Sequence, residues 1–280
     1  MPELPEVETV ARGLKVTLEG HVIAALRQNR VDLRAPFPLD LASRVEGRRV
    51  TLIWRRAKYL LLTLDSGDVL IIHLGMSGSL VIRRDPSVEP SPHDHLVLTS
   101  DDGVTYVLND PRRFGLVAIE KAESLFQHKL FRDLGPEPLG EAFDAETLAA
   151  RLKNKNTPIK SALLDQRVVA GLGNIYVCEA LFRARISPFS RAGSLNRAQA
   201  KRLFEAIRTV LNAAIAAGGS TLRDFVHHDG EFGYFQHSFA VYDREGEACP
   251  GCTCDIDGTG GIERVVQSGR STFYCPRKQP

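Results

Sequence analysis

The hydrophobic pattern of the chain changes its period near Ala122, and this change restricts the possible folds more than any other feature. Before it, short apolar runs are separated by turn-forming stretches such as Asp65-Ser66-Gly67 and Asp101-Asp102-Gly103. After it, apolar residues recur at helical spacing. The pattern predicts an α+β fold in which an N-terminal β-sandwich precedes a mostly helical region.

The expected elements follow from these periods. An amphipathic helix is expected from about residue 5 to Glu19, and Gly20 ends it. The expected strands are 22–26, 49–54, 59–64, 69–74, 80–82, 95–98, 104–108 and 116–119. The expected later helices are 145–154, 158–165, 174–185, 196–217 and 221–226. From about residue 238 the composition becomes strand-like again.

A stretch rich in Gly and Pro, residues 135–140, is typical of a hinge between domains. We expect one domain at 1–134, a linker at 135–144, a helical domain at 145–237 and a hairpin region at 238–280. A chain of 280 residues is long enough for two modest domains with separate cores.

Composition restricts the partners. The formal net charge is only +2, so a nucleic-acid partner has to be argued from local clusters of basic residues. No apolar run reaches membrane-spanning length, and a Glu-rich helix opens the chain where a signal peptide would be apolar. We therefore expect a cytoplasmic protein without a membrane partner.

The first residues offer a nucleophile. If Met1 is removed, Pro2 carries a free terminal amine, and such an amine titrates near ~7.7–8.0, well below a lysine side chain. Glu3 and Glu6 lie close enough in sequence to exchange protons with an iminium formed there. The alternative is structural, because Pro and Glu are also favoured at the start of a helix.

Several basic and aromatic residues stand at predicted turns. Lys58 lies beside Arg55 and Arg56 where two predicted strands join. It could act as an acid or contact a phosphate, and the alternative is that this cluster is a solvated strand end. Met76 and the stretch Asp110-Pro111-Arg112-Arg113-Phe114 have the chemistry of wedges that enter a base stack, although a Phe packed into the sandwich is the alternative. His93-Asp94-His95 could bind a metal or make polar contacts, including one to phosphate.

In the helical region, Gly171-Leu172-Gly173-Asn174 leads into a helix whose exposed N–H groups suit a phosphate. It is not a dinucleotide-binding fingerprint, because it follows no predicted strand. We expect Lys153, Lys155 and Lys160 to extend a basic surface nearby.

Four of the five cysteines lie in the last 32 residues, which indicates a local metal site rather than a disulfide framework. Cys249, Cys252 and Cys275 fit a zinc hairpin, but Lys278 stands where the fourth thiolate is expected. Cys254 could supply the fourth thiolate instead. The alternative hypothesis is a zinc-free hairpin held by apolar residues. In the turn between them, Arg270 would be delivered to a phosphate.

Together these motifs resemble the formamidopyrimidine-DNA glycosylase family over the whole chain. The matching strings, in the family's order, are Pro2-Glu3-Leu4-Pro5-Glu6-Val7-Glu8-Thr9, Arg56-Ala57-Lys58-Tyr59-Leu60, His73-Leu74-Gly75-Met76-Ser77-Gly78, Asp110-Pro111-Arg112-Arg113-Phe114-Gly115, Gly173-Asn174-Ile175-Tyr176 and Arg270-Ser271-Thr272-Phe273-Tyr274-Cys275. The sister endonuclease VIII group usually has Gly where Leu4 stands, so the opening favours the branch that acts on oxidised purines.

The resemblance implies a base-excision-repair enzyme with a helix-two-turn-helix domain and one structural Zn²⁺. As a monomer it would bind double-stranded DNA that carries 8-oxoguanine or formamidopyrimidines opposite cytosine. It would be both a glycosylase and a lyase, cleaving the strand by β- and δ-elimination. The stretch 218–234 matches the loop that closes over the extruded base.

The implied roles can be assigned by position. Pro2 would form the Schiff base, Glu3 would transfer protons at the sugar, Lys58 would serve β-elimination and Arg270 δ-elimination. The implied DNA contacts are Met76, Arg112 and Phe114 in the void of the flipped nucleotide, and His93, Lys155 and Asn174 on the backbone. The alternative function is a lesion-binding protein whose catalysis is reduced or lost because the zinc site is incomplete.

Overall fold

The computed structural model describes residues 2–85, 89–220, 234–251 and 256–280. The chain divides into two compact units. One comprises Met1–Arg132 with Ala217–Tyr234, and the other comprises Asp133–Ala216 with Phe235–Pro280. Residues 217–220 and Tyr234, which flank the stretch 221–233, therefore belong with the first unit although they follow the helices of the second.

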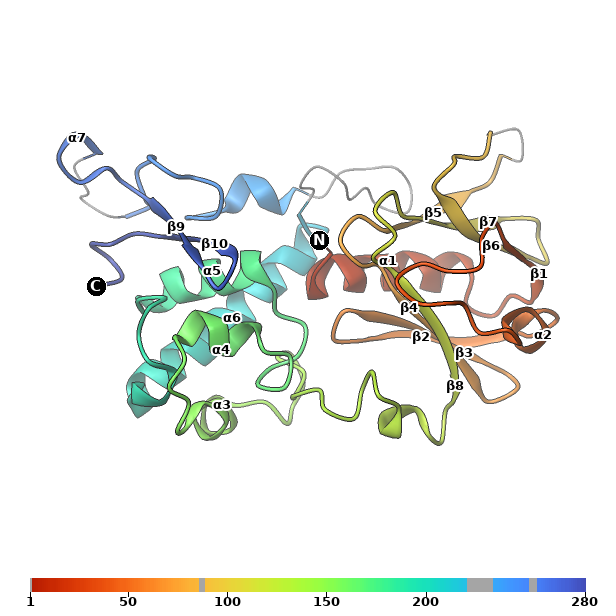
Figure 1. The fold of residues 1–280 in the computed structure, drawn as a ribbon, viewed down its shortest axis with the longest axis horizontal. Coiled ribbons are helices and arrows are strands. Elements are labelled where there is room, and N and C mark those ends of the chain that lie inside the picture. The colour runs from red at the N-terminus through yellow and green to blue at the C-terminus, as the bar shows by residue number, and fades with distance from the viewer. Residues whose placement is uncertain (1, 86–88, 221–233, 252–255) are drawn as a thin grey trace. The chain divides into compact units, whose positions relative to one another are not determined.

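The first unit is a sandwich of two antiparallel four-stranded sheets (Figure 1). One sheet has the order β1-β6-β7-β5, and the other has the order β2-β3-β4-β8. Their bounds are β1 Ile23–Gln28, β2 Val50–Arg56, β3 Tyr59–Leu64, β4 Asp68–His73, β5 Ser79–Arg83, β6 Asp94–Ser100, β7 Thr105–Asn109 and β8 Leu116–Lys121. Buried residues from both sheets, such as Leu62 and Leu98, share one core.

Helix α1 (Leu4–Thr17) packs against strands β2 and β3. Its apolar residues recur every three or four positions, which gives the helix one continuous apolar face. Val7, Val10 and Leu14 on that face are at most 1% exposed and belong to the sandwich core. The start of the chain is thus fixed by the burial of a whole helix face.

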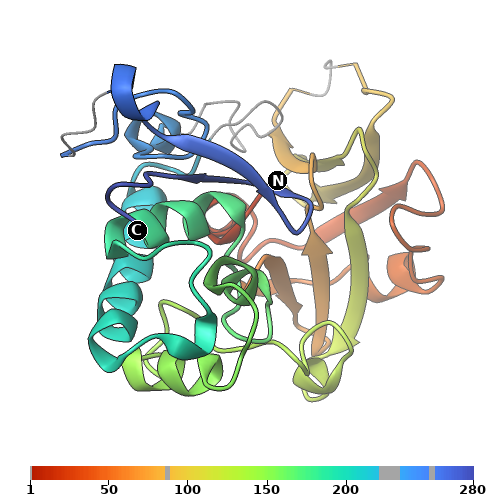
Figure 2. The same cartoon turned by 60° about the vertical axis from the view of Figure 1, so that its left-hand side comes forward.

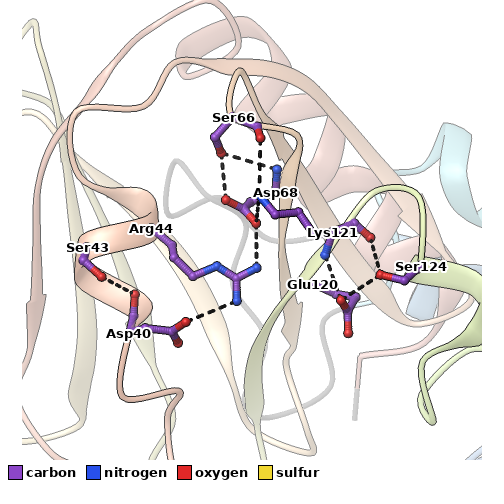
Figure 3. Close-up of polar contacts among 8 residues, drawn as sticks. All are labelled: Asp40, Ser43, Arg44, Ser66, Asp68, Glu120, Lys121 and Ser124. Atoms are coloured by element: carbon purple, nitrogen blue, oxygen red, sulfur yellow. Dashed lines mark hydrogen bonds and ion pairs between the residues drawn. The ribbon is translucent and has the colours of Figure 1, made fainter.

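A charge network joins helix α2 (Leu41–Val45) to the second sheet (Figure 3). Asp68 at the start of β4 accepts from Arg44 at 2.5 Å and lies 3.0 Å from the ammonium of Lys121 on β8. Ser66 also donates to Asp68. Burial by itself would raise the pKa of Asp68, but the hydrogen bonds and positive charges around it lower the pKa to about 2.

The second unit is helical except at its C-terminal end. Helices α5 and α6 pack on each other, as do α3 and α6. Their bounds are α3 Ala145–Leu152, α4 Ile159–Leu164, α5 Asn174–Ala184 and α6 Arg197–Ala216. Short helical turns are η1 Leu125–Gln127 in the first unit and η2 Ala192–Ser194, η3 Phe235–Ser238 and α7 Ile256–Thr259 in the second.

A two-stranded hairpin closes the second unit and lies along α5 (Figure 2). It consists of β9 (Glu263–Gln267) and β10 (Arg270–Tyr274), and Arg270 pairs with Gln267 beside the turn. Phe273, Cys275 and Cys249 pack with Phe182 of α5 in a small apolar cluster. This cluster is far smaller than the sandwich core, so polar contacts matter more for the position of the hairpin.

The predicted α+β fold with an N-terminal β-sandwich and later helices is confirmed. The predicted strands and four of the five later helices are present within a few residues of their expected bounds. The expected helix at 221–226 lies outside the described residues. The short helix α2 was not predicted, because five residues are too few for a periodic signal. None of the helices in the described ranges combines the length and apolar character that crossing a bilayer requires.

Candidate active site

The N-terminus of α1 holds Pro2 and Glu3 in a buried corner. Glu3 is the N-cap residue, and Glu3 and Glu6 form a capping box, in which each side chain accepts from the other residue's backbone N–H. The Glu6 carboxylate accepts from Glu3 N at 2.8 Å. Glu3 is 2% exposed and Pro2 is also buried. A carboxylate is therefore held one residue away from the candidate amine.

Glu6 also ties a distant part of the sequence to this corner. Its second oxygen accepts from Ser220 N at 2.8 Å and from Ser220 Oγ at 3.0 Å. Gly219 has a φ of +81°, and a Cβ there would lie 3.1 Å from Glu6 Oε1. Sequence reasoning assigned Glu6 only a local role; the tie to Ser220 has no sequence signal, since the two residues are more than 200 positions apart.

Lys58 lies in the two-residue turn that joins β2 to β3. Ala57 in this turn has a φ of +54°, and Lys58 is only 8% exposed. Neighbouring Arg55 bonds instead to the Ala57 carbonyl at 2.9 Å and to Glu8 of α1 at 3.1 Å. Lys58 is therefore not a solvated strand end, and it differs in environment from the arginines beside it.

His73 lies at the end of β4, and burial together with nearby positive charges keeps it neutral. Burial lowers the pKa of His73 most, and the positive charges of Lys58 and Arg34 lower it further, to about 4. Its Nδ1 accepts from Gly75 N at 3.0 Å, so Nε2 carries the proton of the neutral ring. His73 is thus a neutral donor at physiological pH, which the sequence did not reveal.

The structure brings together the two turns that carry Met76, Arg112 and Phe114. Their two turns are joined through Ser77 and Asp110, whose side chains bond at 2.7 Å, and Ser77 Oγ also accepts from Arg112 N at 3.1 Å. Met76 and Phe114 are 37% and 44% exposed. The Arg112 guanidinium lies 5.1 Å from the centre of the Phe114 ring. The alternative of a Phe packed into the sandwich is therefore wrong.

A glycine allows these turns to touch. Gly75 has a φ of +66°, and a Cβ at this position would lie 2.3 Å from the backbone carbon of Phe114. Any side chain at Gly75 would separate the two turns. Gly75, one of the glycines that interrupt the apolar run, thus allows the two turns to come into contact.

The stretch 93–95 does not form the metal site considered above. The Asp94 carboxylate accepts from Arg83 at 2.7 Å and from Asn109 at 2.7 Å. His95 is buried and bonds to the Asp110 carbonyl at 2.9 Å. Only His93 is exposed, so it is the member of this stretch that can reach a ligand.

In the second unit, Lys155 follows α3 in a tightly packed turn. Gly193 N donates to the Lys155 carbonyl at 2.9 Å, and a Cβ at Gly193 would lie 3.1 Å from Asn154 N. The backbone of Lys155 is therefore fixed by η2, and the ammonium stands at the end of a flexible side chain.

Lys160 does not extend a basic surface, and this prediction was wrong. It is 1% exposed, and its Nζ donates to Ser271 O at 2.9 Å and to Thr272 Oγ1 at 2.7 Å. Burial, aided by the charge of Arg270, lowers its pKa. The periodic pattern could not reveal this, because the partners lie more than 100 residues later.

Asn174 at the start of α5 shares the same acceptor. Its Nδ2 donates to Ser271 O at 2.8 Å, the carbonyl that Lys160 also binds. Both side chains therefore hold the start of β10, directly after the exposed Arg270. Asn174 can therefore contact a phosphate together with Arg270, or it can hold Arg270 in position through Ser271.

The cysteines fit a metal only in part. Cys249 and Cys275 are buried, and their sulfurs lie 3.3 Å apart, near the ~3.8 Å that a tetrahedral zinc with Zn–S bonds of ~2.3 Å imposes. Cys252 and Cys254 lie outside the described residues. Lys278 donates to Pro250 O at 2.7 Å, so it is not a ligand. The two described thiols fit zinc, and the lysine does not.

Comparison with known proteins identifies the family. The family model described as the formamidopyrimidine-DNA glycosylase N-terminal domain matches residues 1–117, and the one described as the H2TH domain of the same enzyme matches residues 134–226. The formamidopyrimidine-DNA glycosylase of Rhodospirillum centenum is 58% identical over 289 residues and that of Rhodospirillum rubrum 57% over 280, each covering 100% of both chains.

Solved structures agree. The MutM (FPG) protein of Thermus thermophilus superposes with a TM-score of 0.88 at 42% identity, over 99% of this chain and 98% of that one. A mutant of the Lactococcus lactis FPG, in complex with a Fapy-dG containing DNA, has a TM-score of 0.90 at 32% identity, over 99% of both chains. The likeness covers both units, so the chain belongs to the formamidopyrimidine-DNA glycosylase family.

Proposed function

We propose that the chain excises oxidised purines from double-stranded DNA and then cleaves the strand at the resulting site. The observation that carries the proposal is the buried capping box, which fixes Glu3, the residue that directly follows Pro2 in the chain. The family membership supports it, and the Lactococcus lactis relative was solved with Fapy-dG DNA. Another similar structure is MutM in complex with carbocyclic 8-oxo-G containing DNA.

The proposed first step breaks the glycosidic bond. The Pro2 nitrogen forms a bond to C1′ of the extruded nucleotide, the bond from C1′ to the base breaks, and the base leaves with the proton that the Pro2 nitrogen gives up. Glu3 donates a proton to the sugar ring oxygen, the ring opens, and a cationic iminium links Pro2 to the sugar. A buried carboxylate stabilises this cation better than one in water, because the local dielectric constant is low.

The proposed second step cleaves the strand. Loss of a proton from C2′ allows the 3′ carbon–oxygen bond to break, and Lys58 assists this β-elimination. Loss of a proton from C4′ then allows a second elimination to break the 5′ carbon–oxygen bond, with Arg270 at the departing phosphate. Lys58 is buried in a tight turn, which suits a residue that acts at the reacting sugar. Arg270 is exposed on β10, which suits a residue that contacts a phosphate.

We assign the DNA contacts as follows. The cluster of Met76, Arg112 and Phe114 fills the space left by the extruded nucleotide, with Arg112 facing the orphan cytosine. His93, Lys155 and Asn174 bind the backbone phosphates, with Asn174 acting beside Arg270. The protein acts as a monomer, and we place the reaction in the cytoplasm.

Borohydride trapping tests the covalent step. The protein is incubated with a duplex that contains one 8-oxoguanine opposite cytosine while borohydride is present. We expect an adduct whose mass equals that of the protein without Met1 plus the sugar-bearing strand. A form whose terminal nitrogen is acetylated is the control and should give no adduct. An equal adduct yield from both forms would refute the role of Pro2.

We propose that one zinc ion is held by Cys249, Cys252, Cys254 and Cys275. When bound, zinc would cross-link the base of the β9–β10 hairpin and supply no chemistry to the reaction. Cys254→Ser should lower the bound zinc, whereas Cys178→Ala, a buried cysteine of α5, should leave it unchanged. Unchanged zinc in Cys254→Ser would remove Cys254 from the site. Lesion binding without catalysis is not favoured by the family comparison.

A further inference from the structure

Lys278 occupies the position at which the hairpin pattern expects a fourth thiolate, and the structure shows what it does there. Its Nζ donates to Pro250 O at 2.7 Å, across 28 residues of sequence. The same Nζ lies 4.8 Å from the centre of the Phe182 ring on α5. An ammonium has three donors and no acceptor, so a carbonyl and an aromatic face are suitable partners.

The chain around Lys278 is built to keep this geometry. Gln279 is 1% exposed, its Oε1 accepts from Cys275 N at 3.0 Å and its Nε2 donates to Ile186 O at 3.0 Å. Lys278 N and Gln279 N both bond to the Cys275 carbonyl. The residues after β10 therefore form a fixed turn, from which Lys278 reaches back to the first knuckle.

The first knuckle lies against the ammonium. Gly251 has a φ of +65°, and a Cβ at this position would lie 3.5 Å from Lys278 Nζ. Pro250 and Gly251 directly follow Cys249, whose sulfur lies 3.3 Å from that of Cys275. The lysine thus joins the two segments that four thiolates around a zinc would join.

A second lysine holds the other end of the hairpin. Lys160 binds Ser271 O and Thr272 Oγ1 next to the turn, and Gln267 Nε2 donates to Pro188 O at 3.2 Å. Both ends of the two strands are thus attached to the helical unit by contacts that involve no metal.

We propose that Lys278, at the position where the hairpin pattern expects a thiolate, holds the base of the β9–β10 hairpin independently of the four cysteines, so that Arg270 stays positioned when zinc is withdrawn. Lys278 is a positioning residue, because it acts on Arg270 only through the hairpin. The inference depends on the proposed function solely for the role of Arg270 in δ-elimination.

The test combines removal of Lys278 with removal of metal. Lys278→Met keeps the length of the side chain and its contact with Phe182 but loses the donor. The parent, Lys278→Met, Lys278→Arg and a control, Lys201→Met on the exposed face of α6, are each measured with and without a zinc chelator. The readouts are bound zinc, amide hydrogen exchange of β9 and β10, and the ratio of δ- to β-elimination products on abasic DNA.

We expect the chelator to change exchange in β10 little in the parent and in Lys201→Met. In Lys278→Met, chelation should speed this exchange roughly tenfold and lower the δ-product ratio by a similar factor, since one charge-assisted hydrogen bond is lost. Lys278→Arg should behave as the parent, because a guanidinium can also donate to a carbonyl and stack on a ring. Bound zinc before chelation should be equal in all four proteins.

Two results would overturn the inference. If chelation unfolds the hairpin of the parent as fully as that of Lys278→Met, the lysine does not replace a ligand. If amide exchange of β10 in chelated Lys278→Met equals that of the chelated parent, Lys278 does not hold the hairpin in place. A parent that fails to cleave DNA would refute the proposed function, while the exchange measurement would still decide the role of Lys278.

Discussion

Glu3 and Arg270, the two residues assigned to the first and last chemical steps, are held in place by different means. Glu3 stands at the end of a 14-residue helix, one face of which is buried in the core of the sandwich. Arg270 stands on a five-residue strand that contacts a small apolar cluster and is held by polar side chains. Apolar burial fixes the first position, whereas a few directional bonds fix the second.

The difference has consequences for mutation. A helix packed on a large core tolerates the loss of a single contact, since many others remain. A short hairpin depends on each of its buried hydrogen bonds, and a buried donor or acceptor left alone costs free energy. We therefore expect substitutions at the α1 corner to change chemistry more than stability, and substitutions under the hairpin to change stability as well.

The largest expected effect is on chemistry at the α1 corner. Glu3→Gln keeps the size and the acceptor oxygen of the side chain but cannot transfer a proton at neutral pH. Base excision should slow by about 10²–10⁴-fold in single-turnover assays with an 8-oxoguanine duplex, while the urea midpoint changes little. Glu8→Gln, on the same helix but paired with Arg12 and Arg55, is the control. If Glu3→Gln excises the base at the rate of the parent, Glu3 is not a catalytic residue, and the buried helix α1 does not position one there.

Under the hairpin, Lys160→Met should destabilise the protein by about 2–3 kcal/mol, because Ser271 O and Thr272 Oγ1 lose a charged donor. Urea unfolding of Lys160→Met, Thr272→Val and the double variant gives the coupling between the two residues. We expect Thr272→Val to cost less once Lys160 has been removed. Strictly additive costs would mean that the bond of 2.7 Å contributes nothing measurable.

Acid should weaken the sandwich that supports α1. The pKa of Asp68 is about 2 in the folded protein and about 3.9 in an unfolded chain, so its ion pairs stabilise the fold fully above about pH 4. This contribution, about 2 kcal/mol, is lost as the pH falls toward about 2. Urea unfolding of the parent and Asp68→Asn between about pH 2 and about pH 6 should show a stability difference that shrinks in acid. A difference independent of pH would exclude the network in Figure 3 as its source.

The smallest expected effect concerns the link from α1 to Ser220. Glu6→Gln replaces one acceptor oxygen with a donor, so either the bond to Glu3 N or those to Ser220 are lost. Losing about 1.4 kcal/mol of positioning would slow base excision roughly tenfold. Amide exchange of Gly219 and Ser220 should rise together with the loss of rate. Faster exchange with an unchanged rate would separate this link from catalysis.

Local patterns in the sequence determined much of this protein. Periodicity predicted the sandwich and the helices, and the motifs from Pro2-Glu3 to Arg270 identified the family. Such features can be read locally, because backbone propensity and the period of burial act over a few residues. Met76 and Phe114 are exposed, and the Arg112 guanidinium lies over the Phe114 ring, so side chains that could enter a base stack are accessible at these turns.

Only the tertiary structure decided which polar groups meet. Glu6 bonds to Ser220, Lys160 to Ser271 and Lys278 to Pro250, and no pattern of spacing indicates any of these pairs. A hydrogen bond depends on positions within a few tenths of an ångström, which the packing of whole elements sets. Sequence reasoning therefore placed Lys160 in solvent, whereas folding buried it beneath the strand that carries Arg270.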